Sequence, residues 1–150
     1  MKADFFNLIE SGAAGVFRCH APLPATALES AAKRKLRVAA VALPAARDKK
    51  GFLNAMASAL RFPDYFGHNW DAFYDCLLDL KHEDGDGTLL VLQDASGFAR
   101  AAPEEFAAAV DTLTDAAQYW KDEARVLLVV VELETAALAP ELAEISCPAA

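Results

Sequence analysis

The chain has 150 residues, 55% of them hydrophobic, and carries a formal net charge of −8 at pH 7. This length suits a single domain, and the hydrophobic content is typical of a packed globular protein, which argues against a disordered chain. No apolar run approaches the roughly 20 residues of a membrane helix, and polar residues interrupt the N-terminal segment MKADFFNLIESG, which is therefore a poor secretory signal.

The first part of the chain alternates strands and helices. In chain order, the predicted elements are a strand at 15–20, a helix at 26–36, a strand at 37–43 and a helix at 48–61. Thr26 and Glu29 have the spacing of a capping box, and Pro44 ends the second strand. Asp48 is a suitable cap for the second helix, which carries apolar residues at a 3.6-residue period.

The second part continues the alternation after a turn and a helix at 62–80. It predicts a strand at 88–93, a turn at 94–97, a helix at 103–121 and a strand at 125–132, followed by a tail at 133–150 that either holds a short helix at 141–145 or is loose. Pro103 suits the first position of its helix, and the unbroken apolar run of 125–132 is typical of a strand covered on both faces. The order predicts an α/β domain with a mostly parallel sheet.

The segment FPDYFGHNWDAFYDCLLDL, at 62–80, is the most informative part of the chain. Pro63 and Gly67 favour a turn, and Asn69 is a good helix N-cap. Asp71 then falls in the first helical turn, where the helix dipole favours an anion. At about 100° per residue, the large apolar residues gather on one side of this helix, and the other side carries Asp71, Tyr74, Asp75, Leu78 and Asp79.

Two interpretations of the acidic side remain open, a solvated surface and a binding surface. Like charges four residues apart cost a few tenths of a kcal/mol per pair, about 0.2–0.5. No Lys or Arg stands between Arg61 and Lys81 to offset them. Tyr74 and Leu78 among the carboxylates are typical of an interface. These features favour a surface that binds a positively charged partner.

Charge is distributed unevenly along the chain. Residues 1–50 hold nine Lys or Arg and four Asp or Glu, whereas residues 51–150 hold five and eighteen. The acidic part should repel nucleic acid and attract a basic protein. The basic cluster at 33–37 is either a phosphate contact or a complement to the C-terminal end of a short helix.

The three cysteines, Cys19, Cys76 and Cys147, are widely spaced and include no CxxC pair. This spacing predicts reduced thiols with structural roles, as in a cytoplasmic protein.

The segment at 62–80 resembles the signature of the barstar family, the small intracellular inhibitors of barnase-type ribonucleases. That family has a Pro-x-Tyr-Tyr/Phe-Gly-x-Asn turn followed by a helix with the pattern x-Asp-Ala-x-x-Asp-Cys-Leu. The matching residues here, in order and spacing, are Pro63, Tyr65, Phe66, Gly67, Asn69, Asp71, Ala72, Asp75, Cys76 and Leu77. The likeness continues more weakly over 37–132. It leaves out an N-terminal extension at 1–36 and the tail at 133–150.

The resemblance implies a three-stranded parallel sheet with helices packed around it, to which the strand of the N-terminal extension would add a fourth. It also implies an inhibitor that binds a small basic ribonuclease one-to-one and plugs its cleft with the acidic helix and the preceding loop. Asp75 would be the central plug and Asp71 a second contact, while Tyr65 would stack over the catalytic His. Gly67 and Asn69 would contribute loop contacts.

Three further positions complete the candidate surface. Tyr74 takes the place of a family Trp. The late acidic contact of the following helix would be Asp115, or less well Asp111. Asp79 has no acidic counterpart in barstar and either extends the binding surface or faces solvent.

Other kinds of site have weaker support. A metal or acid–base cluster of His68, Asp71 and Asp75 is geometrically possible, but no second His lies at ligand spacing. Residues 82–87 (HEDGDG) lack the spacing of a calcium loop, and the sequence has no nucleophile elbow and no Gly-rich phosphate loop. We therefore expect no cofactor, no metal and no enzymatic activity. The alternatives to an inhibitor are an acidic protein-binding module with another partner and, less well supported, a small hydrolase.

Overall fold

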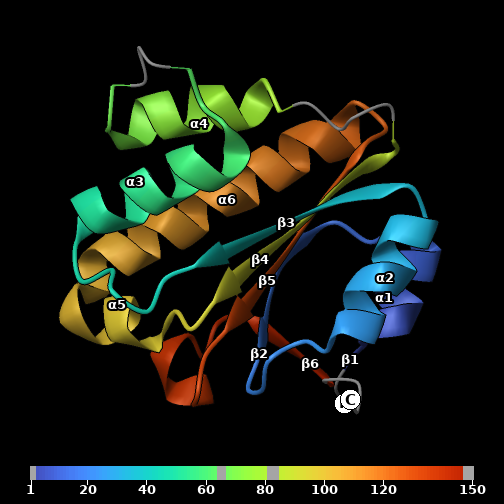
Figure 1. Ribbon diagram of the computed structural model, residues 1–150, viewed down its shortest axis with the longest axis horizontal. Helices are drawn as coiled ribbons and strands as arrows, with labels where there is room; N and C mark the ends of the chain where they lie inside the picture. The colour runs from blue at the N-terminus through green and yellow to red at the C-terminus, as the bar shows by residue number, and fades with distance from the viewer. Residues whose placement is uncertain (1–2, 64–66, 81–84, 147–150) are drawn as a thin grey trace.

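The computed structural model describes residues 3–63, 67–80 and 85–146, and its strands form one sheet in the order β1-β6-β2-β5-β4-β3 (Figure 1). Every pairing of neighbouring strands is parallel. The strands are β1 (Ala3–Asp4), β2 (Gly15–Cys19), β3 (Leu36–Ala42), β4 (Gly87–Gln93), β5 (Val126–Glu132) and β6 (Ala143–Ser146). The helices are α1 (Phe5–Ser11), α2 (Ala25–Lys33), α3 (Lys49–Leu60), α4 (Trp70–Leu78), α5 (Ser96–Ala101), α6 (Pro103–Asp122) and the 3₁₀ turn η1 (Ala136–Leu138).

Helices cover both faces of the sheet. Helices α3 to α6 lie on one side, and α1 and α2 lie on the other (Figure 1). The central strands alternate between the two cores, since Leu90 and Val129 belong to the α3–α6 side whereas Leu89 and Val130 belong to the α1–α2 side. This double covering explains why β4 and β5 are nearly continuous apolar runs rather than alternating ones.

The predicted α/β class and the parallel sheet are confirmed, but the predicted number of three to four strands is too small. The short strands β1 and β6 were not expected. The tail was expected to hold a helix at 141–145 or to be loose, yet residues 143–146 pair with β2 and β1. Ile145 is the only large apolar residue of β6 and is fully buried there. The strand is therefore stabilised by its pairing with β1 and β2 rather than by a strand pattern of its own.

The structure confirms the predicted cap of α3 and contradicts the predicted cap of α2. Asp48 caps α3 as predicted, and its Oδ1 accepts a hydrogen bond from the Gly51 N–H at 2.8 Å. The Thr26 capping box is wrong, because α2 begins one residue earlier, after Pro24, and has no side-chain cap. Helix α1 was not predicted, and the expected turn at 94–97 leads directly into α5.

The cysteines differ from expectation at one position. Cys19 is disulfide-bonded, which contradicts the predicted reduced thiol, whereas Cys76 is free. Disulfides persist mainly in oxidising compartments, so the cysteines no longer support a cytoplasmic location.

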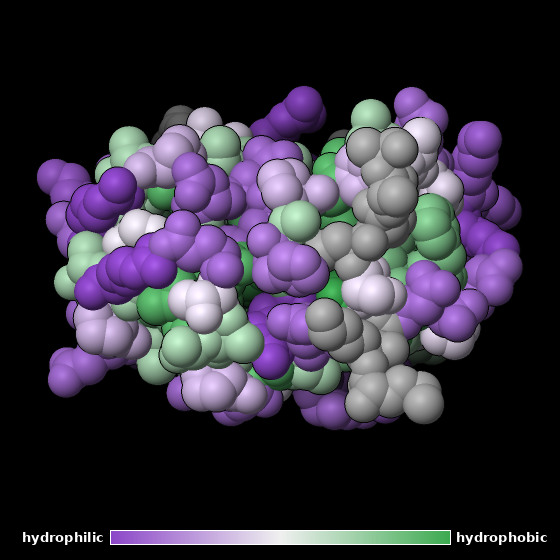
Figure 2. Space-filling view, turned by 90° about the horizontal axis from the view of Figure 1, so that it is seen from below, coloured by the Kyte–Doolittle hydropathy of each residue, from purple (hydrophilic) through white to green (hydrophobic). Residues whose placement is uncertain are grey.

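Few large hydrophobic side chains of the described residues are exposed. Figure 2 shows hydrophilic side chains over most of one face, with hydrophobic surface only in small patches between them. Phe6, 37% exposed, is the only large hydrophobic side chain classed as exposed within the described ranges. In the same ranges, no helix combines the length and apolar character needed to cross a membrane.

Glu132, at the end of β5, is the only buried acidic side chain of the described residues and is 8% exposed. Its carboxylate accepts hydrogen bonds from the backbone N–H of Leu23, at 3.2 Å, and from that of Asp94. Burial raises the pKa of Glu132, and this effect outweighs the two hydrogen bonds, which lower it. The carboxylate thus joins three chain segments at one edge of the sheet.

This raised pKa makes part of the folding stability pH-dependent. The folded protein holds a proton on Glu132 at pH values where the unfolded chain, with a pKa near 4.5, has released it. The corresponding stability is therefore present below the unfolded pKa and is lost as pH rises through the folded value. Urea unfolding of the wild type and of Glu132→Gln across this range should show the wild type losing stability relative to the variant as pH rises. A difference that is constant or has the opposite slope would contradict the assignment.

Candidate protein-binding face

Helix α4 begins where the sequence indicated. Asn69 caps it, with Oδ1 accepting from the Ala72 N–H at 2.8 Å, and Asp71 lies in the first turn. The helix ends at Leu78, with Asp79 as its C-cap. A nine-residue helix is not stable in water by itself, so its position must come from its contacts with the rest of the fold.

Two indole groups fix α4 against α6, one at each end. The Trp70 Nε1–H donates to Glu105 Oε2 of α6 at 3.1 Å. In the opposite direction, the Trp120 Nε1–H of α6 donates to the Leu77 carbonyl oxygen at 2.8 Å. Since the two bonds join the starts and the ends of the helices, α4 and α6 run in the same direction.

Between these bonds, α4 packs on an aromatic cluster. Phe73 is fully buried, and its ring centroid lies 5.6 Å from that of Phe52, 5.9 Å from that of Trp70 and 6.1 Å from that of Phe62. Such edge and tilted ring contacts add about 0.5–1.5 kcal/mol per pair beyond area burial. The packing of its inner side therefore holds α4 rigidly, and the side chains on its outer side are fixed in position with it.

The outer side presents three exposed carboxylates, Asp71, Asp75 and Asp79. In the described part of the chain, none of them has a Lys, Arg or His within 4.0 Å as an ion-pair partner. Consecutive members of the row are four residues apart, which places their Cβ atoms about 5–6 Å from one another. The result is a fixed row of negative charge, which we call the acidic row.

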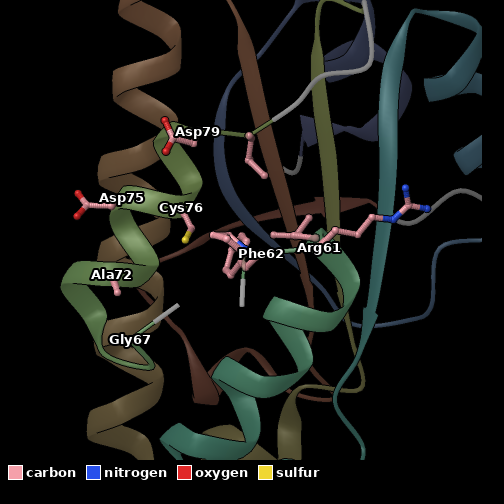
Figure 3. A pocket seen from close by; sticks show the side chains of 10 residues that line it. Arg61, Phe62, Gly67, Ala72, Asp75, Cys76 and Asp79 are labelled. Atoms are coloured by element: carbon pink, nitrogen blue, oxygen red, sulfur yellow. The ribbon is translucent and has the colours of Figure 1, made fainter. Parts of the chain in front are cut away.

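A groove of about 540 Å³ runs between α4 and the C-terminal end of α3. Figure 3 shows the Cys76 thiol pointing toward Phe62 on the floor of this groove, while the carboxylates of Asp75 and Asp79 point away from it. Burial, and then the charges of Asp79 and Asp75, raise the pKa of Cys76. The thiol is therefore held in its protonated, unreactive form, which fits a structural role.

The remaining predicted residues fall into three groups. Tyr65 lies outside the described residues. Gly67 and Asn69 are exposed in the loop that leads into α4. Tyr74 is half-buried and packs against the core, so it is less available to a partner than the helix period suggested.

Helix α6 offers two exposed carboxylates, Asp111 and Asp115, for the late acidic contact. Burial does not distinguish the two, so Asp115 stays a prediction. The metal alternative has no structural support, because the described residues include no group of three or more His, Cys, Asp or Glu that could hold an ion.

Sequence reasoning missed two residues that position α4. The sequence did not predict that Glu105 or Lys49 contacts α4. In the structure, Glu105 binds the Trp70 indole, and the Lys49 ammonium lies 5.5 Å from the centroid of the Trp70 ring. No local pattern signals either contact, since each joins separate helices.

The comparison with protein families identifies the chain. Residues 36–132 match the family model described as "Barstar (barnase inhibitor)", and the chain belongs to this family. No curated protein matches the chain significantly.

Two of the solved structures similar to this one are structures of another protein. Two structures of the ORC2 protein of Aeropyrum pernix, one in ADPNP–ADP complexes and one in its ADP form, are similar with TM-scores of 0.62 and 0.56. Their sequence identities are 14% and 13%, and each match covers 97% of this chain but 45% of the ORC2 chain. This chain thus spans less than half of those proteins, and the likeness shows the α/β fold alone.

The Trp120 bond can be tested by removing its donor. Trp120→Phe keeps an aromatic ring but deletes the N–H, and we expect a loss of about 1–3 kcal/mol in unfolding free energy from the bond and the smaller ring. Urea unfolding measures the global loss, and amide hydrogen exchange should show faster opening of α4. Tyr119→Phe is the matched control. Unchanged exchange in α4 would mean that the indole bond does not hold the helix.

The N-cap gives a second test. Asn69→Ala removes the acceptor for the Ala72 N–H, so we expect a loss of about 0.5–2 kcal/mol in unfolding free energy. Asn69→Asp, which retains the acceptor, should recover most of this loss. If both variants lose the same amount, capping is not the role of Asn69.

Proposed function

We propose that the protein inhibits a small basic ribonuclease of the barnase type by binding it one-to-one. One observation carries the proposal: the acidic row lies on a helix held at both ends, within a segment that matches the barstar signature. Within the described ranges these carboxylates have no cationic side chain within 4.0 Å, so they are available to cations of another protein.

The mechanism is substitution of carboxylates for RNA phosphates. A ribonuclease cleft holds phosphates with cationic side chains, and Asp75 at the centre of the row would accept charge-assisted hydrogen bonds from such groups. Asp71 and Asp79 would make flanking contacts one helical turn away. Because α4 is held in place before binding, little entropy is lost in ordering it, which favours tight association.

The loop and α6 would complete the contact surface. Gly67 and Asn69 are exposed beside the start of α4 and would meet the rim of the cleft. Tyr65 and Tyr74 would supply aromatic contacts, and Asp115 would add a carboxylate from α6. We propose the same roles for these residues that the family signature implies.

We do not propose nucleotide binding from the likeness to ORC2. The ORC2 structures are described as ADPNP–ADP complexes and an ADP form, but this sequence has no Gly-rich phosphate loop. A net charge of −8 also disfavours nucleic acid as a partner.

A second candidate is an acidic protein-binding module of the same family with a partner other than a ribonuclease. Asp79, absent from the family signature, and the layer of α1 and α2, outside the matched residues, favour this alternative. For either function we propose that the whole chain acts as one domain, since helices on both faces pack on the same sheet.

Inhibition is tested by titrating the protein into a barnase-type ribonuclease that cleaves a fluorogenic RNA. The wild type should inhibit stoichiometrically. Asp75→Ala should weaken inhibition at least about 100-fold, because it leaves cations of the cleft buried without a partner. Its association should also become less sensitive to salt.

The matched control is Glu29→Ala, which removes one negative charge from α2 on the opposite face of the sheet. It should change inhibition less than twofold. Equal losses in the two variants would mean that overall charge rather than the acidic row governs binding. An absence of inhibition by the wild type would favour the binding-module alternative.

A further inference from the structure

Positive side chains gather at the N-terminal end of α4, beside the acidic row. A shallow pocket of about 680 Å³ lies there and is lined by Asp48, Lys49, Lys50, Asn54, His68 and Glu105. These residues come from the start of α3, the loop before α4 and the start of α6. We call this pocket the basic corner, after its two lysines, Lys49 and Lys50.

The two carboxylates of the basic corner already serve as acceptors. Asp48 caps α3 through the Gly51 N–H at 2.8 Å, and Glu105 holds the Trp70 indole at 3.1 Å. In the described part of the chain, no carboxylate oxygen lies within 4.0 Å of the ammonium of Lys49 or Lys50. Lys50 is exposed, whereas Lys49 is half-buried with its ammonium over the Trp70 ring. Lys50 is therefore the more available of the two cations.

The fold thus places opposite charges next to each other along one surface. The sequence has no Lys or Arg between Arg61 and Lys81, so no such positive charge lies close to the acidic row along the chain. The structure brings the first turn of α3 to the start of α4, where Lys49 contacts Trp70. The N-terminal ends of α3 and α4 both point their positive dipole ends into this region.

A partner that covers the acidic row must also reach the basic corner. From Asp71 to Asp79 the row is about 12 Å long at 1.5 Å per residue. A stable interface covers about 800 Å² per partner, which corresponds to a patch roughly 30 Å across. A protein centred on α4 therefore extends beyond the first turn of the helix and over Lys50.

We infer that the basic corner, centred on Lys50, is a second recognition site that binds carboxylates of the same protein partner. This inference rests on the proposed function, since it assumes a protein docked on α4. The partner would then carry an acidic patch beside its basic cleft. A ribonuclease with a basic residue at that place would meet a like charge, so the corner would select among related nucleases. A nucleic acid fits less well as the source of the anion, because its continuous negative charge would also meet the acidic row, whereas a protein can present a cationic cleft to the row and a carboxylate to Lys50.

Charge reversal of Lys50 tests the inference on a ribonuclease that the wild type inhibits. Lys50→Glu should slow association about tenfold at low salt, and the difference should shrink as salt rises, since a charge at an interface rim acts mainly on the association rate. The matched control, Lys33→Glu, makes the same charge change on α2 at the opposite face and should have less than twofold effect. Equal rates for the two variants would overturn the inference.

A rescue experiment adds specificity. Single Asp→Lys or Glu→Lys variants of acidic residues beside the nuclease cleft are tested against Lys50→Glu. At least one should restore association, because it re-forms an opposite-charge pair. Failure of every such variant would show that Lys50 has no carboxylate partner there.

An NMR titration with a tetraglutamate peptide tests the corner without any nuclease. Amide shifts should be saturable at residues 48–51 and 67–69, weaker in Lys50→Glu and absent from α2, and a tetranucleotide RNA should shift the same amides less. If the peptide shifts these amides but the protein does not inhibit the ribonuclease, the carboxylate site at the basic corner is supported and the proposed inhibition is contradicted. If the protein inhibits the ribonuclease but the peptide causes no shifts, inhibition is supported and the carboxylate site is contradicted. Stronger shifts with RNA would replace the carboxylate partner by a phosphate one.

Discussion

The hydrogen bonds of two indole groups govern the geometry of the candidate interface. Helix α4 is too short to persist alone, and Trp70 and Trp120 fix its two ends on α6, a helix of 20 residues. The fully buried Phe73 and Leu77 fill the space between these bonds. The row of carboxylates is therefore held by the core of the protein, and its spacing is set before any partner arrives.

The electrostatic repulsion within the acidic row is relieved when a cationic partner binds there. Three like charges on one helix face repel one another by a few tenths of a kcal/mol per pair, about 0.2–0.5. A cationic cleft removes that repulsion and adds attraction, so the same charges that strain the free helix favour the complex. The α1–α2 layer takes no part in this face, since it packs on the opposite side of the sheet (Figure 1). Membership of the barstar family and the charge of α4 thus point to the same surface.

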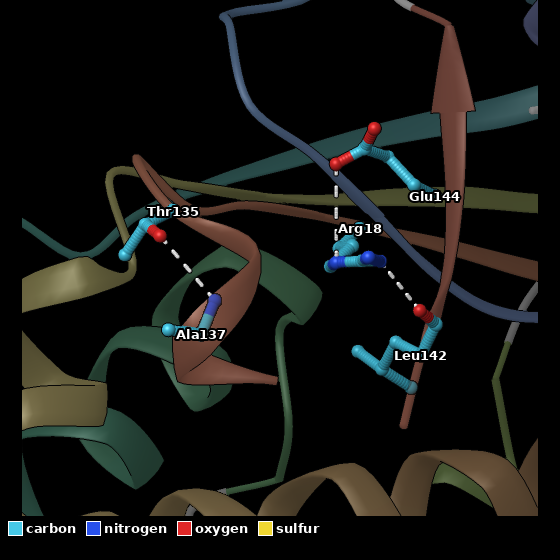
Figure 4. A network of polar contacts seen from close by, with 5 residues as sticks. All are labelled: Arg18, Thr135, Ala137, Leu142 and Glu144. Carbon is cyan, nitrogen blue, oxygen red and sulfur yellow. Dashed lines mark hydrogen bonds and ion pairs between the residues drawn. The ribbon is translucent and has the colours of Figure 1, made fainter. Parts of the chain in front are cut away.

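Features encoded in neighbouring residues could be predicted from the sequence, and features made by distant segments could not. The cap at Asn69 and the buried strand at 126–132 follow from local patterns. Strand β6 does not, because Arg18 of β2 anchors it by donating to the Leu142 carbonyl oxygen at 2.6 Å and by lying 3.9 Å from the Glu144 carboxylate (Figure 4). In the candidate site, the carboxylates of α4 could be predicted from the sequence, but the indole hydrogen bonds and the position of the α3 lysines beside α4 could not. Those contacts depend on how α3, α4 and α6 pack, which no local period encodes.

The most direct test of the central claim is amide hydrogen exchange of the protein alone and bound to a barnase-type ribonuclease. If α4 is the docking element, protection on binding should concentrate in residues 67–79 and the first turn of α3, and the amides of α1 and α2 should exchange unchanged. Protection confined to α1 and α2, with α4 unaffected, would show that the acidic row is a solvated surface and that the partner binds elsewhere.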